Sequence, residues 1–183
     1  MNYPNKVAQK IIWPGFFCLA ILLCASQPAF SKGVYKTNEQ FLQEIFHEGI
    51  IPETQVIWLS GDLKDEIKNI LGHPYDKLRV KYWQKKNRTA WVLEEIGKEK
   101  PITVGFVVND NELENVEVLA FRESRGWEIK HPFFTRQFKG VALKNKSGLN
   151  KNIDGITGAT LSVSAMTRLS QMALYLHQHV TAQ

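Results

Sequence analysis

The stretch that decides the interpretation of this chain reads Asp154-Gly155-Ile156-Thr157-Gly158-Ala159-Thr160-Leu161-Ser162. Two glycines, three hydroxyl side chains and one carboxylate lie together here, directly before a run of regularly spaced apolar residues. Apolar residues at steps of three and four indicate an amphipathic helix. They are Leu161, Ala165, Met166, Leu169, Met172, Ala173 and Leu176. A helix is therefore predicted to begin close to Thr160.

A helix start at Thr160 makes this stretch a candidate anion site. The first N–H groups of a helix have no partner inside the helix, and its dipole places about half a positive charge there. Phosphate is a common ligand of such helix ends. Plain capping of the helix is the alternative, because Ser and Thr are ordinary N-caps and glycines often form the turn before a helix. The stretch matches neither a P-loop nor the dinucleotide-binding fingerprint.

The residues from Asp154 to Thr160 resemble the Asp-x-x-Ser/Thr-Gly-Ala-Thr signature of the FMN-binding domain family. This family includes the flavin-bearing subunits of the sodium-pumping quinone reductase and the Rnf electron-transport complex, and related exported FMN-binding proteins. In the family a flavin transferase takes FMN from FAD and joins it to the last threonine by a phosphoester. The resemblance implies FMN as cofactor and Thr160 as its covalent attachment residue. It also implies that neighbours in the stretch contact the cofactor, namely Asp154, Gly155, Thr157, Gly158, Ala159, Leu161 and Ser162.

The physical properties of the stretch agree with this role. A phosphoester at Thr160 would lie beside the free N–H groups of the helix start. Gly155 and Gly158 have no side chain to hinder a close approach. Asp154 would repel a phosphate, so it is predicted either to hold the loop through backbone N–H bonds or to be recognised by the transferase.

A second candidate segment follows the last predicted strand, and it includes Glu123-Ser124-Arg125-Gly126-Trp127 and Phe133-Phe134-Thr135-Arg136-Gln137-Phe138-Lys139-Gly140. It resembles the Glu-Thr-x-Gly turn and the Phe-x-x-Gln-Phe-x-Gly helix that border the flavin in the family. A flavin ring system needs an aromatic face and polar groups at its pyrimidine edge. Trp127 is a candidate for the face, with a place in the hydrophobic core as the alternative. Glu123 and Ser124 are candidates for the edge.

The middle of the chain predicts an α+β fold built on an antiparallel sheet of at least four strands. The first predicted hairpin has Val80 and Tyr82 before the turn Lys85-Lys86-Asn87, and Ala90 and Val92 after it. The second joins Thr103–Val108 to Val116–Phe121 through Asn109-Asp110-Asn111. Helices are predicted to pack on one face of this sheet, and the C-terminal helix follows the attachment loop.

Two further helices are predicted before the sheet. The first begins at Thr37 or Asn38 and runs through Gly49. The second runs from Asp62 to Leu71 and is ended by Gly72 and Pro74. Residues 32–77 are therefore predicted as an N-terminal helical segment that forms one globular unit with the FMN-binding domain, residues 78–183.

The N-terminus has the pattern of a secretory signal over residues 1–31. Lys6 and Lys10 precede an apolar run from Ile11 to Cys24, and small residues near Ser31 offer a cleavage site. The predicted location is periplasmic or secreted. The alternative is an uncleaved anchor in the inner membrane, although the run is shorter than the roughly 20 residues that span a bilayer.

Composition excludes several kinds of site. Both cysteines lie in the predicted signal, so the mature chain would have no disulfide, thiol chemistry or cysteine zinc site. The five histidines show no metal-ligand spacing, and no metal site is predicted. The net charge of +5 includes Lys6 and Lys10, and the remainder is too low to indicate nucleic-acid binding.

The sequence thus predicts an exported protein that carries FMN and transfers electrons in a bacterial respiratory or redox chain. No catalytic base or substrate pocket is visible, so an electron carrier is favoured over a stand-alone enzyme. Its predicted partners are a flavin transferase and redox proteins of the periplasm or membrane. One alternative is a non-redox module that binds a phosphate-bearing ligand at the helix start. Another is an enzyme with Thr160 or Thr157 as nucleophile, for which no nearby base is recognisable.

Overall fold

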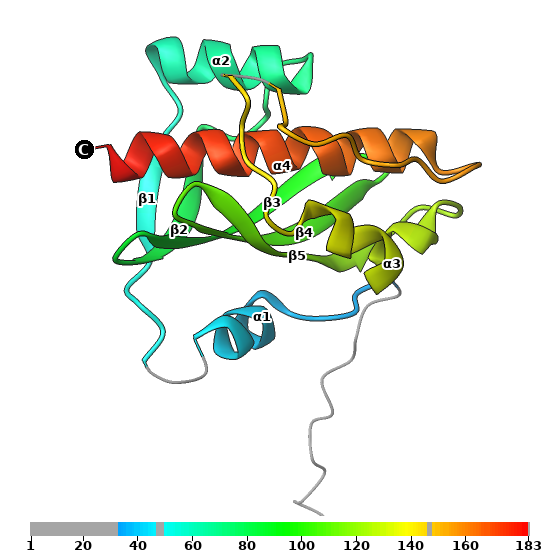
Figure 1. Ribbon diagram of the computed structural model, residues 1–183, viewed down its shortest axis with the longest axis horizontal. Coiled ribbons are helices and arrows are strands. Elements are labelled where there is room, and N and C mark those ends of the chain that lie inside the picture. The colour runs from blue at the N-terminus through cyan, green and yellow to red at the C-terminus, as the bar shows by residue number, and fades with distance from the viewer. Residues whose placement is uncertain (1–32, 47–49, 146–147, 183) are drawn as a thin grey trace, which may run out of the picture.

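The computed structural model describes residues 33–46, 50–145 and 148–182, which form one antiparallel sheet with helices on both faces (Figure 1). The predicted α+β class is confirmed. Neighbouring strands in the sheet follow one another along the chain. The strands are β1 (Gln55–Trp58), β2 (Arg79–Lys85), β3 (Arg88–Ile96), β4 (Pro101–Asn109) and β5 (Glu112–Phe121).

Both predicted hairpins are present, and residues at their turns adopt the left-handed backbone conformation. Lys86 in the β2–β3 turn has φ of 57°, and Asp110 and Asn111 in the β4–β5 turn have φ of 48° and 67°. Asp and Asn are among the residues that tolerate this conformation in tight turns. The fifth strand, β1, was not predicted from the sequence and pairs with β2 at the edge of the sheet.

One face of the sheet is covered by α2 (Gly61–Leu71) and by the long helix α4 (Thr160–Thr181), which lie above it in Figure 1. The main core lies between these helices and the sheet. Alternate strand residues supply it, as the period of a strand requires. They include Tyr82, Trp91, Leu93, Val104, Phe106 and Val108. The predicted second helix is confirmed, and Gly72 ends it with φ of 80°.

The prediction that helices pack on one face only was wrong, because α1 (Asn38–Ile45) covers part of the opposite face. The remaining strand residues form a second apolar cluster there, which includes Trp83, Ala90, Val107 and Leu119. Phe41 of α1 fits over Gly105 of β4, where a Cβ would lie 2.6 Å from the ring. Thr37 begins α1 with a capping box. The helix ends at Ile45, before Gly49, which lies outside the described residues.

Three short helical turns connect β5 to the final loop: η2 (Trp127–Lys130), α3 (Pro132–Thr135) and η3 (Arg136–Phe138). Phe134 and Phe138 are fully buried and pack edge to face with their ring centroids 5.5 Å apart. Gly140 follows with φ of 73°. The resemblance to a Phe-x-x-Gln-Phe-x-Gly helix implied a helical segment here, and the structure has two successive helical turns whose buried rings fix them against the end of the sheet.

The predicted secretory segment, residues 1–31, lies outside the described residues. Within the part of the chain that is described, no helix has both the length and the apolar character needed to cross a bilayer.

Candidate functional site

The N-terminus of α4 is an exposed, uncapped helix end. Thr160 is its first residue and is exposed, as the sequence predicted. Ala159 takes the N-cap position, where no side chain accepts a hydrogen bond from the helix start. The first N–H to find a backbone acceptor is that of Val163, which donates to the Ala159 carbonyl at 2.9 Å. Over the described residues, the N–H groups of Thr160, Leu161 and Ser162 have no acceptor, so they are free to bind an anion.

The loop before α4 leaves open space around its glycines. Gly158 has φ of 83°, in the region that favours glycine. Apart from each glycine and its two chain neighbours, no described residue has an atom within 4 Å of where a Cβ would stand on Gly158 or on Gly155. Thr157 is exposed between them, and the Ala159 N–H donates to the Ile156 carbonyl at 2.9 Å. The loop is therefore shaped by its own backbone and is accessible from outside.

Gln137 of η3 holds the beginning of this loop. The Asp154 N–H donates to Gln137 Oε1 at 2.8 Å, and Gln137 Nε2 donates to the Asp154 carbonyl at 3.4 Å. Lys151 Nζ donates to the Gln137 carbonyl at 3.2 Å. The backbone of Asp154 therefore anchors the loop, while its side chain is exposed. Sequence analysis did not single out Gln137, although the helix motif that contains it was the available signal.

The second candidate segment lies against the first turn of α4. Gly126 has φ of 86°, and a Cβ on it would stand 2.7 Å from Ser162 Oγ and 3.4 Å from the Ala159 Cβ. Only glycine permits this close approach. Ser162 and Ala159 are themselves buried in the contact. Two stretches that are far apart in the sequence, around Gly126 and around Thr160, thus form one site.

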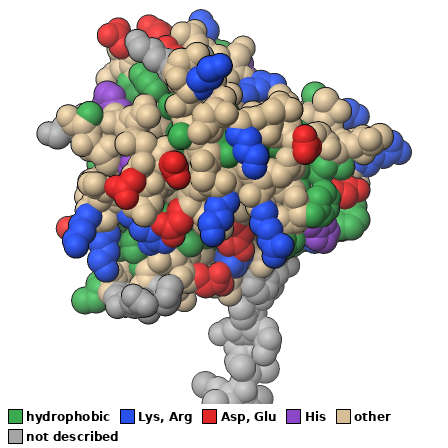
Figure 2. Space-filling view, in the orientation of Figure 1, with side chains coloured by type: hydrophobic (Ala, Val, Ile, Leu, Met, Phe, Trp, Pro, Cys, Tyr) green, Lys and Arg blue, Asp and Glu red, His purple; other side chains and the backbone are tan. Residues whose placement is uncertain are grey.

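Trp127 is not a core residue, since 47% of its surface is exposed. It lies edge to face with His131 at 5.1 Å between ring centroids. Lys130 Nζ lies 4.1 Å from the ring centroid of Tyr35 and 5.5 Å from that of Trp127. Phe133 is 62% exposed. Figure 2 shows apolar and histidine side chains together at the end of the molecule where α3 lies.

The Glu123 carboxylate is hydrogen-bonded to backbone N–H groups of the β3–β4 turn. Its Oε1 accepts hydrogen bonds from the backbone N–H groups of Lys98, Glu99 and Lys100 at 2.6, 2.6 and 2.8 Å. Desolvation by burial would raise the pKa of Glu123, but these N–H groups outweigh it and lower the pKa. One carboxylate oxygen is therefore committed to the turn. Ser124 is exposed beside it.

The assembled residues offer two complementary features to a ligand. Free N–H groups at the α4 start suit a phosphate group, and the exposed ring of Trp127 suits a flat aromatic system. Within the described ranges, no three His, Cys, Asp or Glu residues are placed to hold a metal ion. The donor set therefore fits a phosphorylated aromatic cofactor.

Three comparisons with known proteins were made. Residues 97–175 match the model of the FMN-binding domain family, and this range includes both candidate segments. Among solved structures, the chain is similar to a subunit of the Na⁺-translocating NADH-quinone reductase from Parabacteroides distasonis, at 19% identity and a TM-score of 0.47. That similarity covers 75% of this chain and 83% of the other. A comparison with curated proteins found no match.

Proposed function

From the premise that residues 97–175 of this chain are an FMN-binding domain, we propose that Thr160 carries FMN through a phosphoester and that the protein transfers electrons. The observation that carries this proposal is the exposed Thr160 hydroxyl at a helix start whose first N–H groups have no acceptor within the described chain. These are the groups a phosphate needs.

Attachment requires an exchange of one bond for another. The Thr160 oxygen forms a bond to the phosphorus of the FMN half of FAD, the pyrophosphate bond breaks, and AMP leaves. The hydroxyl proton goes to a base of the flavin transferase. A transferase needs access to the hydroxyl from outside, and the open space around Gly155 and Gly158 supplies it.

Once the phosphate is attached, this chain holds it by two means. The free N–H groups of Thr160, Leu161 and Ser162 are placed to donate to its oxygens, and the positive end of the α4 dipole favours its charge. Gln137 keeps the preceding loop in place through Asp154. The phosphate is thus bound by backbone groups that no side-chain substitution removes.

The isoalloxazine of FMN would supply the redox chemistry when it is bound, and the protein would position that ring. Trp127 offers an exposed aromatic ring, and its neighbour Gly126 packs against the first turn of α4. The protein would then act as an electron carrier between redox partners.

The proposed setting is outside the cytoplasm. Residues 1–31 would direct export, and residues from about 32 onward would form the mature protein. A flavin transferase and redox proteins of the periplasm or membrane would be its partners. Recovery of the protein in the periplasmic fraction tests export, and its absence there would contradict export. N-terminal sequencing of that protein tests cleavage, because an intact Met1 would contradict cleavage.

The attachment proposal is tested by co-expressing the full chain with a flavin transferase. Covalent attachment predicts a yellow protein whose fluorescence survives a denaturing gel, and Thr160→Ala should abolish both. Thr54→Ala is the control, because Thr54 is an exposed threonine outside both candidate segments. It should retain the fluorescence.

Two results would contradict the proposal. Colourless protein in cells with active transferase would favour a non-redox module that binds a phosphate-bearing ligand. Colour that survives in Thr160→Ala and is lost on denaturation would instead indicate noncovalent FMN.

A further inference from the structure

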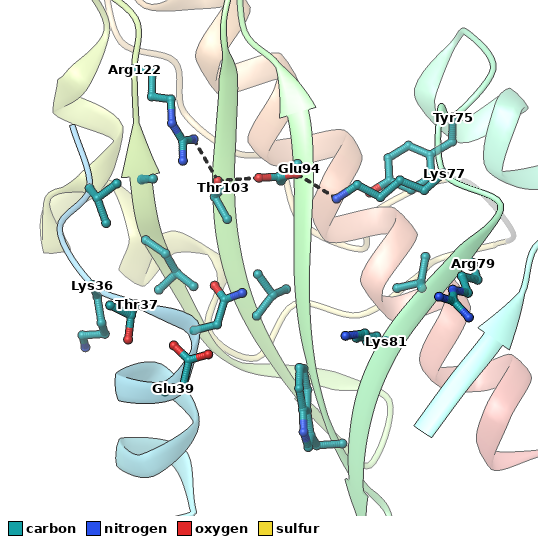
Figure 3. Close-up of a pocket in the computed structure, with 17 residues that line it drawn as sticks. Lys36, Thr37, Glu39, Tyr75, Lys77, Arg79, Lys81, Glu94, Thr103 and Arg122 are labelled. Atoms are coloured by element: carbon teal, nitrogen blue, oxygen red, sulfur yellow. Dashed lines mark hydrogen bonds and ion pairs between the residues drawn. The ribbon is translucent and has the colours of Figure 1, made fainter. Parts of the chain in front are cut away.

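A separate cavity of about 540 Å³ lies on the α1 side of the sheet (Figure 3). One wall is the N-terminal turn of α1, with Thr37 and Glu39. The floor is the part of the sheet that α1 leaves uncovered. This volume falls within the range of about 300–1,000 Å³ that small-molecule sites occupy. The Thr160 site lies at the start of α4, which packs on the other face.

Charged side chains around this cavity are mostly basic. Five are positive, Lys36, Lys77, Arg79, Lys81 and Arg122, and two are negative, Glu39 and Glu94. Figure 3 shows Arg79 and Lys81 on one side and Lys36 on the other. Such an excess of positive charge attracts anions.

Some of these charges are already neutralised by partners. Lys36 pairs with Glu44 and Glu117. Lys77 Nζ donates to Glu94 Oε2 at 2.7 Å, and Thr103 Oγ1 donates to Glu94 Oε1 at 2.9 Å. Arg122 Nη1 donates to Thr103 Oγ1 at 3.1 Å. These contacts run across the sheet, and both oxygens of the Glu94 carboxylate accept a hydrogen bond.

Arg79 and Lys81 are the lining cations that make no hydrogen bond or ion pair with a described residue, whereas Arg122 donates through Nη1 to Thr103 Oγ1 and to the Pro101 carbonyl. Lys81 makes no ion pair or hydrogen bond with any described residue, and Arg79 contacts only the ring of Trp58, 5.5 Å from its centroid. Both are exposed on β2, two residues apart. Residues two apart on a strand point to the same face. Together they can hold one acidic group.

The uncharged lining comprises the polar Thr37, Asn38, Tyr75 and Thr103 and the apolar Val34, Val80, Trp83, Val92, Leu119 and Ala120. Apolar surface beside two free cations is complementary to a molecule with an acidic head and an apolar body. A fully polar anion would leave the apolar wall in contact with water, and an uncharged apolar molecule would leave the cations unused. The geometry points to a binding site for a small amphipathic carboxylic acid, with its carboxylate on Arg79 and Lys81 and its apolar part along Val92 and Trp83.

The test uses decanoate as the probe and the flavin-loaded protein. Titration followed by ¹H–¹⁵N NMR should shift the amide signals of residues that line the cavity, such as Lys81, Val92 and Thr103. Decyltrimethylammonium carries a similar apolar chain with the opposite charge, and acetate carries the acid without the chain. Both should bind at least tenfold more weakly than decanoate.

Variants then test which cations hold the acid. Lys81→Glu should weaken decanoate binding at least tenfold. The matched control is Lys85→Glu, the same charge reversal at an exposed position of β2 that does not line the cavity. It should change affinity less than twofold. Thr160→Ala should leave decanoate binding unchanged, which separates this site from the flavin proposal.

Several outcomes would overturn the proposal. Equal binding of decanoate and decyltrimethylammonium would show adsorption on apolar surface only. Equal losses of decanoate affinity in Lys81→Glu and Lys85→Glu would show a general effect of the protein's charge and no specific site. A hexaglutamate peptide that binds more tightly than decanoate would assign the cavity to an acidic polypeptide segment instead. Absence of shifts along the cavity would show that decanoate has no site there.

Discussion

The side-chain amide of Gln137 contacts both backbone polar groups of Asp154, accepting from its N–H at 2.8 Å and donating to its carbonyl at 3.4 Å. These two residues lie in different segments, the short helical region after β5 and the loop before α4. The contact ties Asp154, at the beginning of the loop before α4, to a region fixed by buried Phe134 and Phe138.

Substitution Gln137→Ala should slow attachment of FMN to Thr160 by roughly fivefold, corresponding to a loss of about 1 kcal/mol of loop ordering. The fold should persist, because Gln137 is only half-buried. In-gel flavin fluorescence against time, with transferase and FAD added, measures the rate. Gln171→Ala on α4 serves as a control. An attachment rate equal to that of the protein without the substitution would show that Gln137 does not position the loop.

Substitution Gly126→Ala should be more damaging than Gly158→Ala. Both glycines have positive φ, so each alanine carries a backbone cost of about 1–2 kcal/mol. At Gly126 the new methyl also meets Ser162 Oγ at 2.7 Å, which adds about 1–3 kcal/mol. Thermal unfolding of both variants measures the difference. Ser162→Ala in the Gly126→Ala background should recover part of the loss, and equal stabilities of the two single variants would contradict the close contact.

Substitution Trp127→Leu should increase the fluorescence of bound FMN with little change in unfolding temperature. Trp127 is 47% exposed, so its removal costs the core little. A stacked indole would quench the flavin, and leucine cannot stack. The control is Trp58→Leu, another exposed tryptophan, on the edge strand β1. Identical flavin fluorescence in both variants would place the ring away from Trp127.

The stability of the fold should depend on the protonation of His177. This side chain is buried, and its Nδ1 lies 2.8 Å from Thr89 Oγ1, which also accepts a hydrogen bond from Trp91 Nε1. Burial lowers the pKa of His177 below its usual value of 6.5. Below pH 6.5 the unfolded chain therefore binds a proton here that the folded chain does not.

Because the folded chain binds fewer protons at His177 than the unfolded chain, the His177 contribution to the free energy of unfolding is constant above pH 6.5. This contribution falls as the pH decreases from 6.5 toward the lowered pKa. His73 acts in the opposite direction, because a backbone hydrogen bond to Pro74 and the Glu95 carboxylate raise its pKa despite desolvation. The measurement is therefore the difference in unfolding temperature between unmodified protein and His177→Gln, from about pH 7.5 to about pH 5.5. The difference between the two unfolding temperatures should become smaller as the pH decreases. Parallel curves for the unsubstituted protein and His177→Gln would contradict the assignment.

Local patterns were enough to predict much of this fold. The start of α4 at Thr160 follows from apolar residues at helical spacing, and both hairpins follow from polar turns between alternating strands. The strand β1 could not be predicted in the same way, because only Ile57 of its four residues is buried and no alternation is visible. Its place is decided by pairing with β2.

Contacts between distant segments explain what the sequence could not predict. The position of α1 depends on Phe41 fitting over Gly105, which no local pattern reports. The contacts of Gln137 with Asp154 and of Gly126 with Ser162 join segments without regular periodicity. Glu123 was predicted at the flavin edge from its position after a strand. The structure adds that one of its oxygens holds the β3–β4 turn.

The central claim concerns one bond, and tandem mass spectrometry of the digested protein tests it most directly. After co-expression with a flavin transferase, the peptide containing Thr160 should gain the mass of FMN less one water, with fragment ions that place it on Thr160. An unmodified Thr160 peptide in protein that is otherwise yellow, or the same mass on another residue, would contradict the account.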